Sequence, residues 1–90
     1  MRKIRLDGRK MDSRTQAHSY LQRMLTLPEY YGANLDALAD CLSEVSGVVI
    51  IMAYSEAMKN SLGEYGVRLL EVLKAAGAGR TDFFFRQTSK

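Results

Sequence analysis

The chain has 90 residues, of which 47% are hydrophobic and 26% charged, and it carries a formal net charge of +3 at pH 7. This length suits one domain, residues 1–90, with a modest core. No apolar run approaches the roughly 20 residues that span a membrane, and no apolar segment follows the basic N-terminus as in a secretory signal. The single cysteine excludes an internal disulfide, so we expect a cytoplasmic protein.

The first third of the chain predicts a strand followed by a helix. Apolar and polar residues alternate from Lys3 to Leu6, which favours a strand, and Asp7-Gly8 is typical of a turn. Ser13 and Gln16 have the spacing of a capping box at the start of a helix. The apolar face of that helix is Ala17, Tyr20, Leu21, Met24 and Leu25.

The stretch from Leu27 to Leu42 contains the only proline and the only cysteine. Pro28 should end the preceding helix, and Gly32 permits a sharp turn at positive φ. Asn34 is a good N-cap, so a second helix is predicted from about Leu35 to Ser43.

The second half of the chain predicts two more strands. The short apolar run Val48–Met52 favours a strand buried on both faces, and Asp82–Arg86 favours a last strand. Between them we expect a short helical turn at 55–58, a loop at 60–63 and a longer helix over 64–76, ended by two glycines. The order predicts an α/β fold in which a small three-stranded parallel sheet packs with about four helices.

The helix predicted at Leu35–Ser43 has two different faces. Its apolar stripe is Leu35, Leu38, Cys41 and Leu42, whereas Asp36, Ala39, Asp40 and Ser43 share the opposite side. The helix dipole favours Asp36, but Asp40 gains little from it and repels Asp36 at i, i+4. Glu44 adds an acid near the C-terminal end of the helix, where the dipole disfavours negative charge. These unfavourable placements indicate that the acidic face has a function.

Charge is also segregated along the chain. Residues 24–58 contain five acidic residues and no Lys or Arg, whereas residues 1–23 and 59–90 are net basic. A local acidic field attracts a cationic partner, although a chain this short can segregate charge by chance.

Residues 27–42 resemble the corresponding segment of the barstar family, intracellular inhibitors of the ribonuclease barnase. Only Ala33 and Ala39 depart clearly from that pattern, and weaker similarity extends through Ile4–Met11 and Glu64–Ala76. The resemblance implies a barstar-like fold and an inhibitor or immunity protein. Such a protein places carboxylates in the cationic active site of a barnase-like ribonuclease.

The resemblance also implies roles for individual residues. Asp40 matches the family's central carboxylate, Asp36 a second contacting acid and Tyr30 a packing tyrosine. Gly32 and Asn34 match backbone and amide contacts. The complete expected partner-binding set is Tyr30, Tyr31, Gly32, Asn34, Asp36, Ala39, Asp40, Ser43 and Glu44.

Some positions depart from the family pattern. Ala39 stands where the family has tryptophan, and Ala75 aligns with a third contacting acid of the family. The sequence pI near 9.2 also contrasts with the acidic barstar. A different cationic nuclease or protein therefore remains an alternative partner.

Two other functional classes are less well supported. An enzyme is not expected, because no base–nucleophile pair, metal-ligand spacing or glycine-rich nucleotide motif is present, and the lone His18 reads as a surface or boundary residue. Basic residues 2–10 could bind nucleic acid, but no recognition motif accompanies them. We therefore expect no cofactor, metal, nucleic acid or membrane partner, and a monomer when free.

Overall fold

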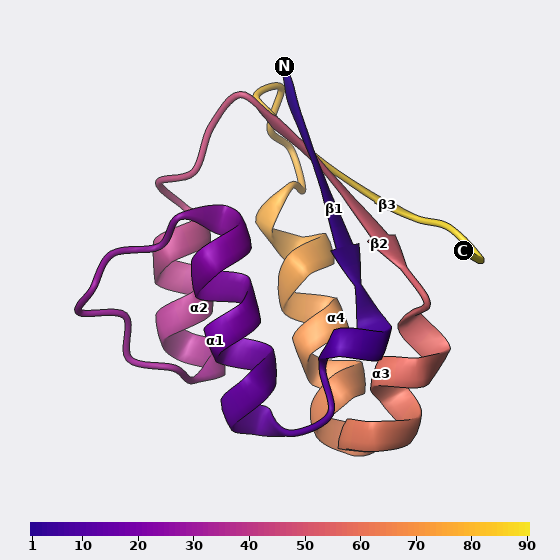
Figure 1. Ribbon diagram of the computed structural model, residues 1–90. Coiled ribbons are helices and arrows are strands. Elements are labelled where there is room, and N and C mark those ends of the chain that lie inside the picture. Colours follow the sequence, from indigo (N-terminus) through magenta and orange to yellow (C-terminus); the bar gives the residue numbers. More distant parts are fainter.

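The computed structural model describes all 90 residues. Three strands, four α-helices and one short 3-10 helix follow one another along the chain (Figure 1). They are β1 (Arg2–Asp7), η1 (Gly8–Lys10), α1 (Arg14–Leu25), α2 (Leu35–Leu42), β2 (Val48–Ala53), α3 (Ser55–Leu62), α4 (Glu64–Ala76) and β3 (Phe83–Gln87). The predicted fold class, a parallel three-stranded α/β architecture with four helices, is confirmed.

The sheet has the order β1-β2-β3, and both pairings are parallel. Lys3 lies opposite Val49, which lies opposite Phe84, and Arg5, Ile51 and Arg86 form the corresponding row two residues further on. Because side chains alternate between the two faces of a strand, these two rows project from the same side of the sheet.

The helices cover only one face of this sheet. In Figure 1, α1, α2 and α4 lie on one side of the strands, and no helix lies on the other. The inward residues Val48, Ile50 and Met52 of β2 are fully buried, whereas the outward Val49 and Ile51 are only partly buried. The expectation that β2 is buried on both faces is therefore wrong, because its outer face has no covering layer.

The predicted start and end of α1 are confirmed. The hydroxyl of Ser13 accepts a hydrogen bond from the backbone N–H of Gln16 at 3.1 Å, which caps α1. The helix ends at Thr26, whose φ of 53° is left-handed, two residues before Pro28.

The predicted loop at 60–63 is wrong. The short turn expected at 55–58 is a complete helix, α3, that continues to Leu62. Gly63 alone separates α3 from α4, with a φ of 62° that suits glycine. Asn60 and Ser61 are weak helix formers, but packing of α3 against α4 and η1 outweighs that small propensity cost.

The hydrophobic core lies between the inner sheet face and the helices, and its largest fully buried side chains include Phe83, Leu6 and Met11. The predicted last strand is present as β3, in which Phe83 is fully buried whereas Phe84 is 45% exposed. None of the helices has the length and apolar character needed to cross a membrane.

Candidate functional site

Helix α2 holds the two aspartates on a rigid support. Its N-cap, Asn34, accepts a hydrogen bond from the backbone N–H of Ala37 at 2.7 Å. On the inner side Leu38 and Leu42 are fully buried, whereas Asp36 and Asp40 are exposed. The core contacts therefore fix the rotation of the helix, and both carboxylates point to solvent one turn apart.

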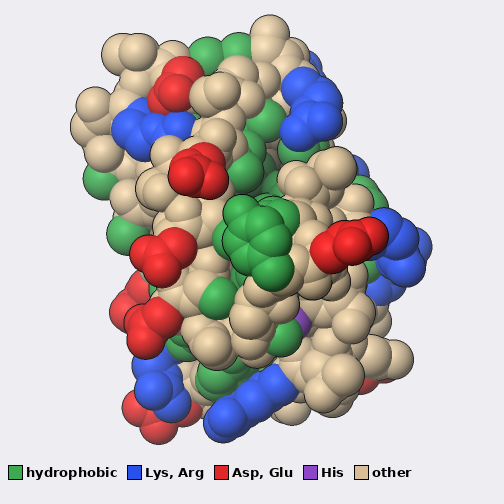
Figure 2. All heavy atoms as spheres, turned by 90° about the vertical axis from the view of Figure 1, so that its left-hand side faces the viewer, with side chains coloured by type: hydrophobic (Ala, Val, Ile, Leu, Met, Phe, Trp, Pro, Cys, Tyr) green, Lys and Arg blue, Asp and Glu red, His purple; other side chains and the backbone are tan.

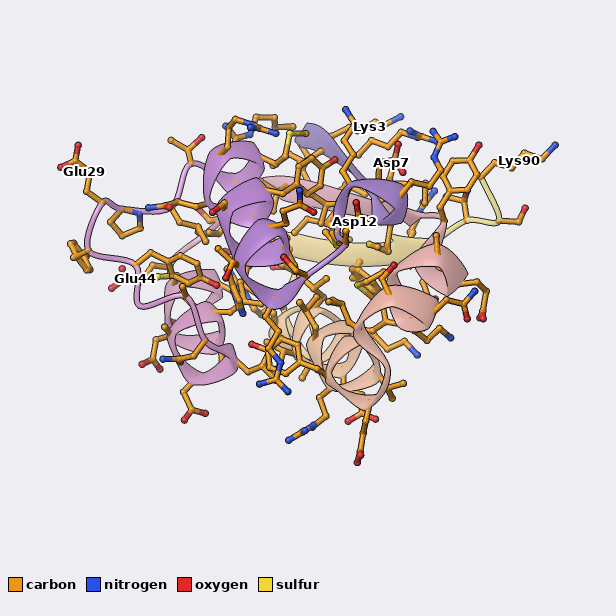
Figure 3. The ribbon with its side chains drawn as sticks, turned by 60° about the horizontal axis from the view of Figure 1, so that its bottom comes forward. Lys3, Asp7, Asp12, Glu29, Glu44 and Lys90 are labelled. Atoms are coloured by element: carbon orange, nitrogen blue, oxygen red, sulfur yellow. The ribbon has the colours of Figure 1, made fainter.

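No Lys or Arg side chain forms an ion pair with these carboxylates. The ion pairs of the protein involve only Asp7, Glu56 and Asp82, so Asp36, Asp40 and Glu44 have no such partner. Figure 2 shows several acidic side chains down one side of the molecule, with basic side chains among them at two places and along the other edges of the view. Figure 3 places Glu29 and Glu44 on this same side, away from Lys3.

Hydrogen bonds to the carbonyl of Pro28 hold the connection between α1 and α2, residues 26–34. The side-chain amide of Gln22 donates to the carbonyl of Pro28 at 2.9 Å, and the N–H of Tyr31 donates to the same carbonyl at 3.0 Å. Within this turn the two tyrosines separate, since Tyr30 is 83% exposed and Tyr31 only 9%. Tyr30 therefore adds a large aromatic surface beside α2.

Tyr31 points inward and binds His18. Its hydroxyl lies 2.5 Å from Nδ1 of His18, and the hydroxyl of Tyr65 lies 2.6 Å from Nε2 of the same ring. His18 is only 2% exposed, so the expectation of a surface or boundary histidine is wrong. Burial lowers the pKa of His18 and raises the pKa of Tyr31, so a neutral imidazole joins α1, the α1–α2 connection and α4.

The sharp turn before α2 does not use Gly32 as predicted. The positive φ, 53°, belongs to Ala33, and Gly32 is not among the residues with positive φ. A Cβ atom on Gly32 would lie 3.3 Å from the Cβ of Ala37. Glycine at this position therefore permits the chain to pass close to the first turn of α2.

A hollow between α2 and α4 adjoins the acidic face. Its lining contains Asp36 together with charged residues that sequence analysis did not select: Arg14, Arg68 and Glu71. A second hollow is lined by Ala39, Ser43, Val72, Ala75, Ala76 and Arg80. Glu71 lies one helical turn before Ala75, so a carboxylate from α4 is present at this surface although the expected position holds alanine.

Arg80 anchors the C-terminal end of α2. Its guanidinium donates to the carbonyls of Leu42 at 3.0 Å and Ala76 at 3.3 Å, and also to the carbonyl of Val45. It pairs with Asp82 at 2.9 Å, which lowers the pKa of that carboxyl. Helix α2 has no basic residue in its last turn, so Arg80 supplies the favourable positive charge from a distant part of the chain.

The site contains no arrangement suited to covalent or metal chemistry. No group of three His, Cys, Asp or Glu side chains could hold a metal ion. Burial, with Glu44 and Asp40 nearby, raises the pKa of the Cys41 thiol, which disfavours the reactive thiolate. The surface around α2 presents the carboxylates of Asp36, Asp40 and Glu44, which form no ion pair, and the exposed ring of Tyr30.

Most of the expected partner-binding set is exposed to solvent. Tyr30, Gly32, Asn34, Asp36, Ala39, Asp40, Ser43 and Glu44 are all exposed. Tyr31 is the exception, because it is buried and its hydroxyl forms a hydrogen bond with His18. That inward orientation depends on His18, which is 13 residues from Tyr31, so no local pattern around Tyr31 predicts it.

Comparison with known proteins finds similarity over nearly the whole chain. The sequence model of a family described as "Barstar (barnase inhibitor)" matches residues 1–88. A Bacillus subtilis (strain 168) protein named "Putative ribonuclease inhibitor YrdF" is 37% identical over 86 residues, which cover 93% of this chain and 94% of that protein.

Proposed function

Because the chain belongs to the barstar family, we propose that it is a ribonuclease inhibitor and not an enzyme. It binds the active site of a barnase-like or other cationic ribonuclease through the exposed face of α2. The observation that carries this proposal is the pair Asp36 and Asp40, exposed on one helix face without a cationic partner.

The chemistry of the target explains why such a pair is useful. A ribonuclease holds an anionic phosphodiester, so its active site presents Arg, Lys or protonated His side chains. A carboxylate in that site takes the place of a phosphate and forms short charge-assisted hydrogen bonds. Because Leu38 and Leu42 anchor α2 in the core, Asp40 and Asp36 lose little conformational freedom on binding.

Tyr30 and the acidic surroundings complete the proposed interface. The ring of Tyr30 is 83% exposed and rigid, so it offers apolar contact area at a low entropy cost. Long-range attraction between the acidic surface and a cationic nuclease speeds encounter, and salt weakens it.

The details of the surface favour a partner that differs from barnase. The lining of one hollow contains Ala39, where the family resemblance places a tryptophan, and Arg14 and Arg68 line the same hollow as Asp36. A nuclease that fills the hollow and offers acidic groups to these arginines would fit better. A cognate nuclease outside the barnase type, with this chain as its immunity protein, is therefore the second candidate.

The test is inhibition of a panel of microbial ribonucleases, including barnase, by the wild type, Asp40→Ala and Asp12→Ala. Asp12 is an exposed acid before α1, so its variant loses the same charge outside the proposed interface. We expect stoichiometric inhibition of at least one nuclease and a loss of about 2–5 kcal/mol of binding free energy for Asp40→Ala alone. Equal effects of the two variants, or no inhibition by the folded protein, would refute the proposal.

A further inference from the structure

The uncovered side of the sheet carries a second surface of opposite charge. We call it the open face and define it by the six outward side chains of the two register rows: Lys3, Val49, Phe84, Arg5, Ile51 and Arg86. No helix covers it, so these residues contribute to solvent-accessible surface and not to the core (Figure 1).

The open face has a regular distribution of charge and apolar surface. Val49 and Ile51 form an apolar centre on β2, with Lys3 and Arg5 on β1 at one edge and Arg86 on β3 at the other. Neighbouring strand backbones lie about 4.8 Å apart and alternate residues of a strand about 6.6 Å apart, so basic residues are the immediate cross-strand neighbours of the apolar centre on both sides. Phe84 adds an aromatic ring that is 45% exposed.

The cations of the open face are free to bind an anion. Lys3, Arg5 and Arg86 are exposed and form no ion pair. The carboxylates that flank the strands, Asp7 and Asp82, are each bonded to their own arginine, at 2.9 Å in both cases. The structure thus divides the basic N-terminal cluster, since Arg9 forms an ion pair with Asp7 whereas Lys3 and Arg5 form none. The pKa of Asp7 is lowered mainly by its hydrogen bond with Arg9 and only to a smaller extent by the charge of Arg5.

We propose that the open face binds single-stranded nucleic acid. Proteins that bind single strands combine aromatic rings, on which bases stack, with cations that contact the phosphates. Here Phe84, Val49 and Ile51 provide the stacking and apolar surface, and Lys3, Arg5 and Arg86 provide the phosphate contacts. This binding surface is distinct from the acidic face of α2 and does not depend on the proposed inhibition.

Charge argues against a second copy of the chain as the occupant. A symmetric dimer through the open face would bring Lys3, Arg5 and Arg86 of both copies together, without acidic residues to compensate. Like charges across an interface oppose association. The exposed aromatic ring among the cations favours nucleic acid, because flat bases can stack on it.

The test is fluorescence anisotropy with a labelled oligouridylate of about 12 nucleotides, a length within the usual range of single-strand sites. The variants Lys3→Gln and Lys10→Gln are matched: both remove one exposed lysine, but Lys10 lies in η1, outside the open face. We expect Lys3→Gln to weaken binding and to reduce the slope of log Kd against log salt by about 0.7, while Lys10→Gln has a much smaller effect.

Phe84 tests the stacking component separately. Phe84→Leu should weaken binding roughly 5- to 100-fold with an unchanged salt slope, and Phe84→Tyr should retain most of the affinity because it keeps a ring. The anionic face of α2 plays no part here, so Asp40→Ala should bind the oligonucleotide at least as well as the wild type.

Several results would overturn the proposal. These are absence of binding at low salt, equal effects of Lys3→Gln and Lys10→Gln, and binding to duplex RNA as tight as to the single strand. Binding to phosphatidylglycerol vesicles without binding to the oligonucleotide would assign the open face to membranes instead. Self-association abolished by Phe84→Leu, with no nucleic-acid binding, would assign it to a dimer.

Discussion

Replacing Arg80 should destabilise the protein more than any exposed charge does. In Arg80→Ala the carbonyls of Leu42, Val45 and Ala76 lose a charged donor, and Asp82 loses its ion pair. Hydrogen bonds to charged groups contribute about 1.5–3 kcal/mol each, but they are not additive, and water can replace some of them at this partly exposed site. We therefore expect the free energy of unfolding to fall by about 2–4 kcal/mol, a large part of the ~5–15 kcal/mol of a typical domain.

Urea denaturation followed by circular dichroism measures this loss, with Arg80→Lys and Lys74→Ala alongside. Arg80→Lys keeps the charge but lacks the planar fork that reaches several oxygens, so an intermediate loss is expected. Lys74 is exposed on α4 and forms no ion pair, so its variant should change stability by less than about 0.5 kcal/mol. If Arg80→Ala costs no more than Lys74→Ala, Arg80 does not anchor α2.

Three further predictions concern the interior and the proposed interface. Burial lowers the pKa of His18 in the folded state below the value of about 6.5 of a free imidazole, so the unfolded state binds more protons in mild acid. The free energy of unfolding should therefore fall by up to about 1.4 kcal/mol per pH unit as the pH drops below about 6.5 toward the folded-state pKa. Equal urea curves at pH ~7.5 and ~5.5 would contradict this. Ala33 has a left-handed φ of 53°, which glycine adopts without strain, so Ala33→Gly should raise the free energy of unfolding by about 0.5–1 kcal/mol. A lower thermal midpoint for this variant would count against backbone strain at Ala33. Ala39→Trp should change the free energy of unfolding by less than about 0.5 kcal/mol, because Ala39 is exposed beside a hollow. The same variant should bind barnase more tightly than the wild type does. An unchanged affinity would show that this position lies outside the interface.

Local sequence signals predicted most of the fold because each acts within a few residues. The caps Ser13 and Asn34 form the expected bonds to Gln16 and Ala37, and the elements follow in the predicted order. The extension of α3 to Leu62 was missed, because tertiary packing overrides the weak propensity of that segment.

Features that depend on distant parts of the chain could not be predicted. The pairing of His18 with Tyr65 joins residues 47 apart, and the contact of Arg80 with Leu42 joins residues 38 apart. The apolar run of β2 indicates burial, but it does not indicate whether helices cover one face of the sheet or both. The open face could therefore not be predicted from the sequence.

Within the candidate site, the exposed carboxylates were predictable but their surroundings were not. Helical spacing placed Asp36 and Asp40 on one face, and both are exposed as expected. Glu71 and Arg68 reach the same surface from α4, and no pattern within residues 27–42 contains that information. The burial of Tyr31 could not be predicted, because adjacency to Tyr30 does not indicate which of two neighbouring side chains points inward.

The most direct test of active-site inhibition is competition between this protein and an active-site nucleotide for the same ribonuclease. A fluorescent nucleoside 3′-phosphate bound to an inhibited member of the panel is titrated with the wild type and, in parallel, with Asp40→Asn, which is close in size but uncharged. If the carboxylates occupy the phosphate site, the wild type displaces the nucleotide completely at stoichiometric concentration, and Asp40→Asn does so only at much higher concentration. A stable ternary complex, with the nucleotide still bound while the protein is attached, would contradict the account.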